Sequence, residues 1–265
     1  MKKIVITMLV VMVVLTSVFA FTACNKSDAK SIEEKEYFVC GITYYSPMNY
    51  FEGDELVGFD TELAQAVAEV LDLEVKFQLI NWDSKFLELN SGAIDCIWNG
   101  FTVDEERKEN VDFSKSYLNN SQCIVVKASK ASLYTSKESF SGKNSAAEAG
   151  SAGADYAKEY AGEANYTDVD SQMKALTEVN AGNVDFVVVD VTLAKANVGK
   201  GDYASLAIID NSIACIEPEE YAIGFRKGSD FTAKVNQALA TLYANGKIAE
   251  IAAKYGLYNA LIPIE

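Results

Sequence analysis

One pattern, a helix end followed by a glycine and then an apolar strand, occurs twice and constrains the fold more than any other feature of the chain. The two copies are residues 86–95 (FLELNSGAID) and 176–185 (LTEVNAGNVD). The glycine can adopt the left-handed conformation that ends a helix, and the strand begins after an aspartate. The copies lie 90 residues apart, which is too far for a solenoid repeat. The pattern therefore predicts two similar α/β lobes.

The segments around these copies continue an alternation of strands and helices. Apolar runs at residues 37–42 and 75–80 predict strands, and Asp60 is placed to cap a helix whose apolar residues recur at helical spacing. Residues 231–255 predict two further helices separated at Gly246. Strands that alternate with helices pair in parallel, so the fold class is α/β.

The carboxyl ends of two predicted strands indicate where a ligand would bind. These ends are residues 99–102 (NGFT) and 189–190 (VD). In open α/β sheets a ligand lies just beyond the carboxyl ends of the strands. A small molecule held between two lobes would contact both segments.

The composition excludes several classes of protein. The 265 residues include no histidine, so a Ser-His-Asp relay and an imidazole-bound metal are both excluded. With 38 acidic and 23 basic side chains the formal charge is −15, which is unfavourable for binding nucleic acid. The sequence has no phosphate loop and no metal-ligand cluster, so we expect no cofactor and no metal. Acidic residues are abundant enough to leave a carboxylate metal site open.

The N-terminal segment has the features of a secretion signal. Two lysines precede the apolar stretch 4–21, and small residues follow it up to Cys24. This ending resembles a bacterial lipoprotein box, which implies a signal peptide at 1–23, a lipid on Cys24, a polar tether at 24–35 and a location on the outer face of the cell membrane. A plain signal peptide and a membrane-spanning anchor are the alternatives. The chain without residues 1–23 loses two lysines and no acid, which leaves a charge of −17.

Several ordered motifs together resemble the polar amino acid-binding proteins of bacterial ABC importers, which are extracellular solute-binding proteins of family 3. The similarity extends from about residue 37 to about residue 257. The motifs are 57–64 (VGFDTELA), 99–108 (NGFTVDEERK), 111–114 (VDFS) and 184–190 (VDFVVVD). Their order and spacing make the resemblance far more specific than any one of them.

The resemblance implies a type II periplasmic binding protein, in which two Rossmann-like α/β lobes joined by a two-strand hinge close on an amino acid. It implies a monomeric receptor, not an enzyme, that delivers its ligand to the permease subunits of an ABC transporter. Mapped onto this chain, lobe 1 comprises 36–116 and 219–265, lobe 2 comprises 122–213, and the hinge comprises 117–121 and 214–218.

The resemblance also implies a clamp for the two charged groups of a free amino acid. Arg107 would bind the carboxylate through its planar fork, helped by the backbone amides of Thr102 and Ala152. Asp190 would bind the ammonium, with the Gly100 carbonyl and the Thr102 hydroxyl as further acceptors. Each charge also has an ordinary interpretation, because Arg107 could pair with acids on the surface and Asp190 could cap the following helix.

Further expected ligand contacts come from two aromatic residues and a glycine-rich segment. Trp82 and Tyr45 correspond to positions where the family places aromatic side chains against the ligand, although Trp82 could equally be a core residue. The segment 149–153 (AGSAG), which includes Ser151, could begin a helix whose free amides favour an anion.

Departures from the family pattern bear on the side chain that is bound. Ile42 stands where some members with basic or amide ligands have an acid, which favours a neutral polar or apolar amino acid. Asp104 replaces a common threonine. Glu148 follows a short stretch that is usually more apolar, and it would either select a cation in the pocket or lie in solvent. We expect the solvent-exposed position, because the rest of the surface is acidic.

The cysteines allow one further hypothesis. Cys40 and Cys96 lie in predicted strands, where we expect buried thiols. Cys123 and Cys215 lie beside the two strands that the resemblance makes a hinge, so a disulfide between them is conceivable. The sequence alone does not choose among the possible pairings.

Two other functions stay open on this fold. The first is a dehydratase acting on cyclic amino acid precursors, which would need a general acid that the sequence does not identify. The second is a ligand-sensing receptor subunit. No apolar segment after Cys24 is long enough for a receptor that carries its own membrane span.

Overall fold

A ten-stranded sheet runs through the residues that the computed structural model describes, 35–214 and 216–264. Its main path is β4-β1-β5-β12-β7-β10-β8-β9, with β6 and β11 attached to β12 and β7. The predicted signal peptide, the lipidated Cys24, nearly all of the tether and Cys215 lie outside the described residues. Within that part of the chain, no helix has both the length and the apolar character needed to cross a membrane.

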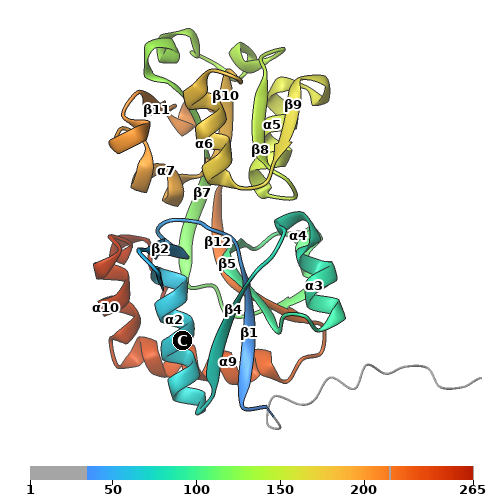
Figure 1. Ribbon diagram of the computed structural model, residues 1–265, viewed down its shortest axis with the longest axis vertical. Helices are drawn as coiled ribbons and strands as arrows, with labels where there is room; N and C mark the ends of the chain where they lie inside the picture. Colours follow the sequence, from blue (N-terminus) through green and yellow to red (C-terminus); the bar gives the residue numbers. More distant parts are fainter. Residues whose placement is uncertain (1–34, 215, 265) are drawn as a thin grey trace, which may run out of the picture. The chain divides into compact units, whose positions relative to one another are not determined.

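The first lobe contains the three parallel strands at one end of this path. They are β4 (Glu74–Leu79), β1 (Tyr37–Ile42) and β5 (Cys96–Thr102). Helices cover both faces of these strands (Figure 1): α2 (Phe59–Leu71), α9 (Phe231–Ala244) and α10 (Lys247–Lys254) on one, α3 (Lys85–Ser91) and α4 (Glu105–Asn110) on the other. Three short strands complete the lobe: β2 (Tyr50–Glu52), β3 (Glu55–Val57) and β6 (Val111–Phe113).

The second lobe repeats this arrangement on a smaller scale. Its strands are β10 (Phe186–Asp190), β8 (Ser145–Glu148), β9 (Tyr166–Val169) and β11 (Leu206–Ile208). Its helices are α5 (Ala152–Ala161), α6 (Gln172–Ala181), α7 (Val191–Asn197) and the single turn α8 (Asn211–Ala214). Because β10, β8 and β9 are parallel neighbours, their carboxyl ends lie at one edge of the sheet.

Two long strands connect the lobes. β7 (Leu118–Lys127) and β12 (Pro218–Arg226) pair antiparallel, with Leu118 opposite Tyr221 and Ser121 opposite Pro218. Figure 1 shows both strands passing from one group of elements to the other. The fold is therefore the α/β architecture with two lobes that the sequence predicts.

The two copies of the helix-glycine-strand pattern are confirmed. α3 ends at Gly92 and α6 ends at Gly182, with φ angles of 81° and 85°, and β5 and β10 follow. These left-handed angles suit glycine because it has no Cβ. The two C-terminal helices, α9 and α10, are also confirmed, and Gly246 stands between them.

The core of the first lobe depends on the apolar face of α2. Leu63 and Val67 are fully buried on that face, and each such burial contributes roughly 1.5–3 kcal/mol to stability.

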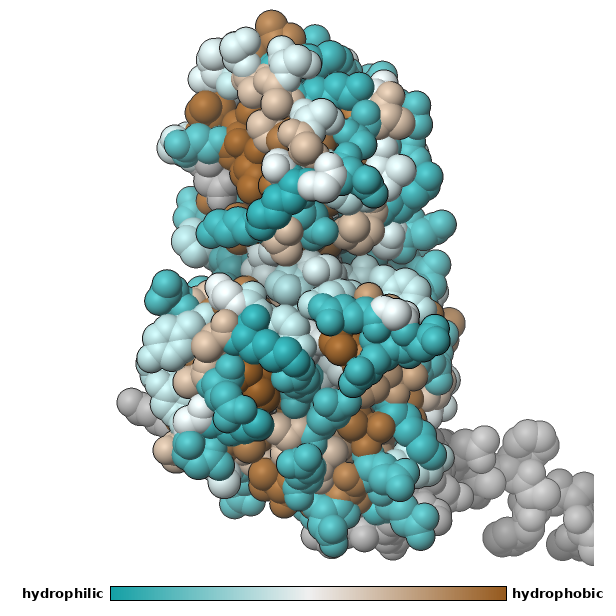
Figure 2. Space-filling model, turned by 60° about the vertical axis from the view of Figure 1, so that its left-hand side comes forward, coloured by the Kyte–Doolittle hydropathy of each residue, from teal (hydrophilic) through white to brown (hydrophobic). Residues whose placement is uncertain are grey.

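Hydrophilic side chains cover much of the molecular surface seen in Figure 2, with apolar ones scattered among them. This distribution accords with an acidic balance carried largely by the surface.

The prediction that Asp60 caps α2 is wrong. Gly58 occupies the cap position, and Asp60 lies in the first turn, fully buried. Its carboxylate accepts hydrogen bonds from the Gly100 N–H at 2.7 Å and the Tyr117 hydroxyl at 2.9 Å. Burial raises the pKa of Asp60 to about 7, against the lowering effect of these bonds. The side chain thus supports the end of β5 instead of the start of α2.

The thiols are buried as expected, and no disulfide joins them. Cys40 and Cys96 are free and face each other across β1 and β5, with their Sγ atoms 3.5 Å apart. Cys123 is also free and buried, so the structure does not support a disulfide from it across the connecting strands.

Candidate functional site

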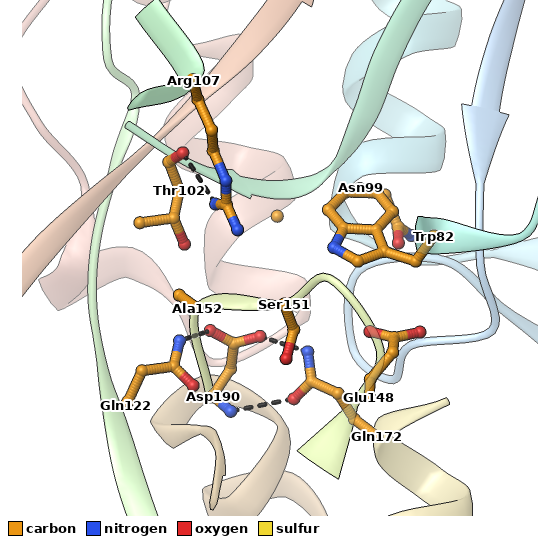
Figure 3. Close-up of a pocket in the computed structure, with 11 residues that line it drawn as sticks. Trp82, Asn99, Thr102, Arg107, Gln122, Glu148, Ser151, Ala152, Gln172 and Asp190 are labelled. Carbon is orange, nitrogen blue, oxygen red and sulfur yellow. Dashed lines mark hydrogen bonds between the residues drawn. The ribbon is translucent and has the colours of Figure 1, made fainter. Parts of the chain in front are cut away.

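A small pocket lies where the carboxyl ends of strands from both lobes meet (Figure 3). Seven of the eight predicted ligand contacts line it, namely Trp82, Gly100, Thr102, Arg107, Ser151, Ala152 and Asp190. Asn99, from the predicted strand end 99–102, also lines it, as do Glu148, which was expected in solvent, and Gln122 and Gln172, which the sequence did not identify. Only about 10 Å³ is open to the centre of a water molecule, which is close to the minimum that one water needs.

Arg107 is buried and fixed at the start of α4. Its backbone N–H bonds to the Asp104 carboxylate at 2.7 Å, and its Nε lies 3.1 Å from the same group. Nη1 donates to the Thr102 carbonyl at 3.0 Å. The guanidinium has five N–H donors, so these contacts leave Nη2 for another acceptor. Figure 3 shows this end of Arg107 directed into the pocket. Asp104, the departure from the family pattern, therefore orients the arginine.

Asp190 is the last residue of β10, and its carboxylate does not cap α7. Oδ1 accepts from Asn120 Nδ2 at 2.7 Å and Gln122 Nε2 at 2.6 Å, and Oδ2 accepts from Gln172 Nε2. The Asp190 N–H donates back to Gln172 Oε1 at 2.8 Å. A carboxylate has about four lone-pair sites, so the three amides fix the group and leave roughly one site on Oδ2.

Thr102 and Gly100 provide the polar end of β5. Thr102 Oγ1 donates to Glu219 Oε1 at 3.1 Å, which leaves the lone pairs of the hydroxyl as acceptors. Gly100 has a φ of 56°, and a Cβ there would lie 2.7 Å from the Tyr45 ring.

Glu219, the partner of Thr102, is a further buried acid near the pocket. Burial is the main cause that raises its pKa to about 8, and the Asp190 charge adds to the shift. Glu219 lies on β12, outside the motifs that the sequence shows, so no pattern predicted it.

The two predicted aromatic contacts have different positions. Trp82 is buried against the pocket, and its ring packs edge-on against Phe101 at 5.6 Å between centroids. Tyr45 does not belong to the pocket lining. It lies behind Gly100, where its hydroxyl is 2.6 Å from the Tyr221 hydroxyl.

The glycine-rich segment begins a helix, as predicted. Ser151 is the N-cap of α5, and its Oγ accepts from the Ala154 N–H at 3.1 Å. The N–H of Ala152, at the first position of the helix, has no carbonyl partner within the helix. The positive end of α5 therefore faces the pocket and favours an anionic group.

The expectation that Glu148 lies in solvent is wrong. It is the last residue of β8, only 3% exposed, and it lines the pocket. Its Oε1 atom is buried without a hydrogen-bond partner among residues 35–214 and 216–264. Burial, and then the Asp190 charge, raise the pKa of Glu148 to about 8, while Lys85 and Arg107 oppose the shift.

Lys85 lies close to this end of the pocket and joins the two lobes. Its Nζ donates to the Trp82 carbonyl at 3.2 Å and to the Gly150 carbonyl at 2.9 Å. Burial, and then the Arg107 charge, lower the pKa of Lys85 to about 8. A buried lysine that bonds a carbonyl of the opposite lobe stabilises the arrangement in which the lobes are close together.

The pocket combines hydrogen-bond donors and acceptors that could meet both charges of an organic zwitterion. Within the described part of the chain, no three acidic or cysteine side chains are grouped so that they could hold a metal ion. Arg107 and the start of α5 present donors to an anion, and Asp190 with Thr102 presents acceptors to a cation. In Figure 3, Arg107 and Thr102 lie on one side of the pocket, and Ser151, Ala152 and Asp190 lie on the other, so each side carries both donors and acceptors.

Comparison with known proteins identifies relatives along most of the chain. The model of bacterial extracellular solute-binding proteins, family 3, matches residues 38–258. The arginine-binding extracellular protein of Bacillus subtilis (strain 168) is 31% identical over 240 residues, which cover 89% of this chain and 92% of that protein.

Solved structures show the same similarity. An ABC uptake transporter substrate-binding protein from Streptococcus pneumoniae with bound histidine matches with a TM-score of 0.76 at 32% identity, covering 83% of this chain and 92% of that one. An ancestral amino acid-binding protein, described as a precursor of cyclohexadienyl dehydratase, matches with a TM-score of 0.75 at 26% identity, covering 83% of this chain and 95% of that one.

Proposed function

The chain belongs to the bacterial extracellular solute-binding proteins, family 3, and on that premise we propose that it is the substrate-binding protein of an amino acid ABC importer. It binds a free L-amino acid between its lobes and delivers it to the permease subunits. Relatives named for binding arginine, cystine, histidine and glutamine support an amino acid as the ligand.

The observation that carries the proposal is the placement of Arg107 and Asp190 in one buried pocket. A zwitterion brings a carboxylate and an ammonium into a closed site, and each would be costly to bury without a partner. Arg107 has donors left for the carboxylate, and the Ala152 N–H adds another. Asp190 has an acceptor site left for the ammonium, with Thr102 beside it.

We propose that binding proceeds by opening and closing of the lobes. The pocket is enclosed by residues of both lobes and has little free space, so a solute enters when the lobes separate. The hinge would be residues 117–121 and 214–218, at the start of β7 and just before β12, where the chain passes between the lobes. Ligand contacts from both sides, together with the bond from Lys85 to Gly150, would then favour the closed form that the permease recognises.

We also propose that the protein is a monomer held at the outer face of the cell membrane by a lipid on Cys24, with 24–35 as a tether. The apolar segment before Cys24 supports this proposal. Acyl chains at one terminus anchor a folded domain without a spanning helix. Mass spectrometry of the membrane-extracted protein should find the acylated cysteine at the N-terminus, and Cys24→Ala should release the protein from membranes.

A thermal-shift screen with the twenty amino acids tests the ligand assignment. A ligand that binds the native state raises the melting temperature by mass action. Arg107→Ala and Asp190→Ala should both abolish the shift produced by the best ligand, whereas Asp170→Asn, at an exposed position of the second lobe, should not. If no amino acid stabilises the wild-type protein, the assignment fails.

A dehydratase is the second candidate, and two observations favour it. One solved relative is described as the precursor of such an enzyme. In addition, the pKa of Glu148, raised to about 8 by burial, would keep a proton on this carboxyl at neutral pH, as a general acid requires. Formation of an aromatic product from a cyclohexadienyl acid, followed by ultraviolet absorbance and lost in Glu148→Gln, would establish this function in place of transport.

A further inference from the structure

The pocket contains one buried polar group that the amino acid clamp leaves unused. Glu148 Oε1 has no hydrogen-bond partner in the part of the chain that the structure describes, although the residue is 3% exposed. An unpaired buried carboxylate oxygen is unfavourable by about 1–3 kcal/mol or more. Such a group is stable in a native protein when something else supplies the missing donor.

The cations around Glu148 do not supply that donor. No ion pair of the described residues within 4.0 Å includes Glu148. Lys85 is one candidate, but its Nζ donates to the carbonyls of Trp82 and Gly150. Arg107 is bound to Asp104 and Thr102. Both act on Glu148 only as more distant charges.

The position of Glu148 relates it to the side chain of a bound amino acid. In Figure 3, Arg107 and Asp190 lie toward one end of the pocket, while Trp82 and Glu148 lie toward the other. A ligand whose carboxylate meets Arg107 and whose ammonium meets Asp190 must extend its side chain along the remaining direction. That side chain would run beside the indole of Trp82 and end near Glu148.

We propose that Glu148 selects amino acids whose side chain ends in a cationic N–H donor, so that the ligand class is the basic amino acids. The inference rests on the proposed function. A cation at this point supplies the missing hydrogen bond to Oε1 and pairs with the carboxylate. The indole face of Trp82 adds a favourable surface for the cation. A neutral apolar side chain would bury the carboxylate without a partner.

The proposal revises the expectation drawn from Ile42, which favoured a neutral ligand. Ile42 lies at the end of β1 in the first lobe, is 2% exposed and does not belong to the pocket lining. Glu148 supplies a carboxylate from the second lobe instead. The residue at position 42 therefore does not decide the charge of the ligand, and Glu148 does.

Two isosteric pairs of ligands test the proposal on the wild-type protein. Titration calorimetry compares L-lysine with L-norleucine, which lacks the ammonium, and L-arginine with L-citrulline, which lacks the charge. We expect at least one basic amino acid to bind roughly 100-fold more tightly than its neutral partner, because the neutral one supplies neither a donor to Oε1 nor a charge that pairs with the ionised Glu148. Equal or tighter binding of both neutral partners would overturn the proposal. Absence of binding by every amino acid would instead overturn the proposed function.

A charge-neutral variant assigns the effect to Glu148. Glu148→Gln keeps the shape of the side chain and should reduce the affinity for the basic ligand roughly 100-fold while changing that for its neutral partner less than about 3-fold. Glu106→Gln is the matched control, because Glu106 is an exposed acid lining the adjacent outer cleft, and it should leave both affinities unchanged. If Glu148→Gln keeps the wild-type ratio of affinities, Glu148 does not select the ligand.

Discussion

Two buried carboxylates of the second lobe, Asp190 and Glu148, lie at the ends of neighbouring strands but differ in the hydrogen bonds that they accept. Asp190 accepts amide hydrogen bonds from three side chains, whereas Oε1 of Glu148 accepts none from residues 35–214 and 216–264. Both strands, β10 and β8, run parallel and side by side. The difference therefore lies in the surrounding side chains and not in the backbone.

The difference separates two tasks of one pocket. Every amino acid has the same ammonium, so the group that binds it can be fixed in advance by permanent partners. Side chains differ between ligands, and a group left without a partner favours only those ligands that complete it. Preorganisation thus provides affinity for the whole class, and an unsatisfied group provides discrimination within the class.

Asp190→Asn should cause the largest loss of affinity. It tests whether the preorganised Asp190 provides affinity for the whole class of amino acids. The variant removes the charge and directs an amide toward other amide donors, so the affinity for all amino acids should fall by a similar factor of roughly 1000. Calorimetry with lysine and norleucine measures both losses, and circular dichroism checks the fold. A variant that loses one ligand but keeps the other would show that Asp190 also reads the side chain.

Glu148→Gln tests whether Glu148 is buried without a partner in the ligand-free protein, through the pH dependence of stability. Burial and the Asp190 charge raise the pKa of Glu148 to about 8, while Lys85 and Arg107 act against the shift. A raised carboxyl pKa means that the native state binds the proton more tightly, so this contribution to stability is present below pH 4.5 and is lost as the pH rises through 8.

The free energy of unfolding of the ligand-free variant, minus that of the wild type, should therefore increase by about 3 kcal/mol between pH 5 and pH 8. Urea denaturation at a series of pH values measures this difference. Any constant penalty for burying the glutamine amide cancels in the comparison. A difference that does not change with pH would mean that Glu148 is not buried in the unliganded protein.

Local patterns predict most of the fold but not the state of Glu148. Gly92 and Gly182 mark the helix ends because the left-handed angle is a local property of the chain. Glu148 ends the four-residue strand β8, which is too short to show a period. Its burial arises in a pocket that Trp82 and Arg107 of the other lobe also line, so the neighbouring sequence does not determine it.

The roles of Asn120, Gln122 and Asp60 also depend on residues that are distant in the sequence. The spacing of Asn120 and Gln122 by two residues in β7 was an available signal, because alternate residues of a strand share one face, and both side chains bind Asp190. The local preference of Asp60 for a cap gave way to distant donors, Gly100 and Tyr117.

Lys85→Met should change the ratio of lysine to norleucine affinity, but by less than Glu148→Gln does. The variant removes the bond to the Gly150 carbonyl, so all amino acids should bind more weakly. It also removes a cation that repels a basic side chain and offsets part of the Glu148 charge. The ratio of lysine to norleucine affinity should therefore rise by about 5-fold, which corresponds to the roughly 1 kcal/mol expected for two charges screened by water. An unchanged ratio would indicate that Lys85 and Glu148 are not coupled.

Tyr45→Phe should change ligand affinity least. It tests whether a well-bonded group outside the pocket lining contributes to binding. The Tyr45 hydroxyl is paired with that of Tyr221 at 2.6 Å, so it is as well satisfied as Asp190, but Tyr45 is not part of the pocket lining. Losing this bond should lower the free energy of unfolding by about 1 kcal/mol and change the affinity for any amino acid less than about 2-fold. A larger loss of affinity would mean that Tyr45 contacts the ligand, as the family resemblance implies, and that satisfied groups outside this pocket also contribute to binding.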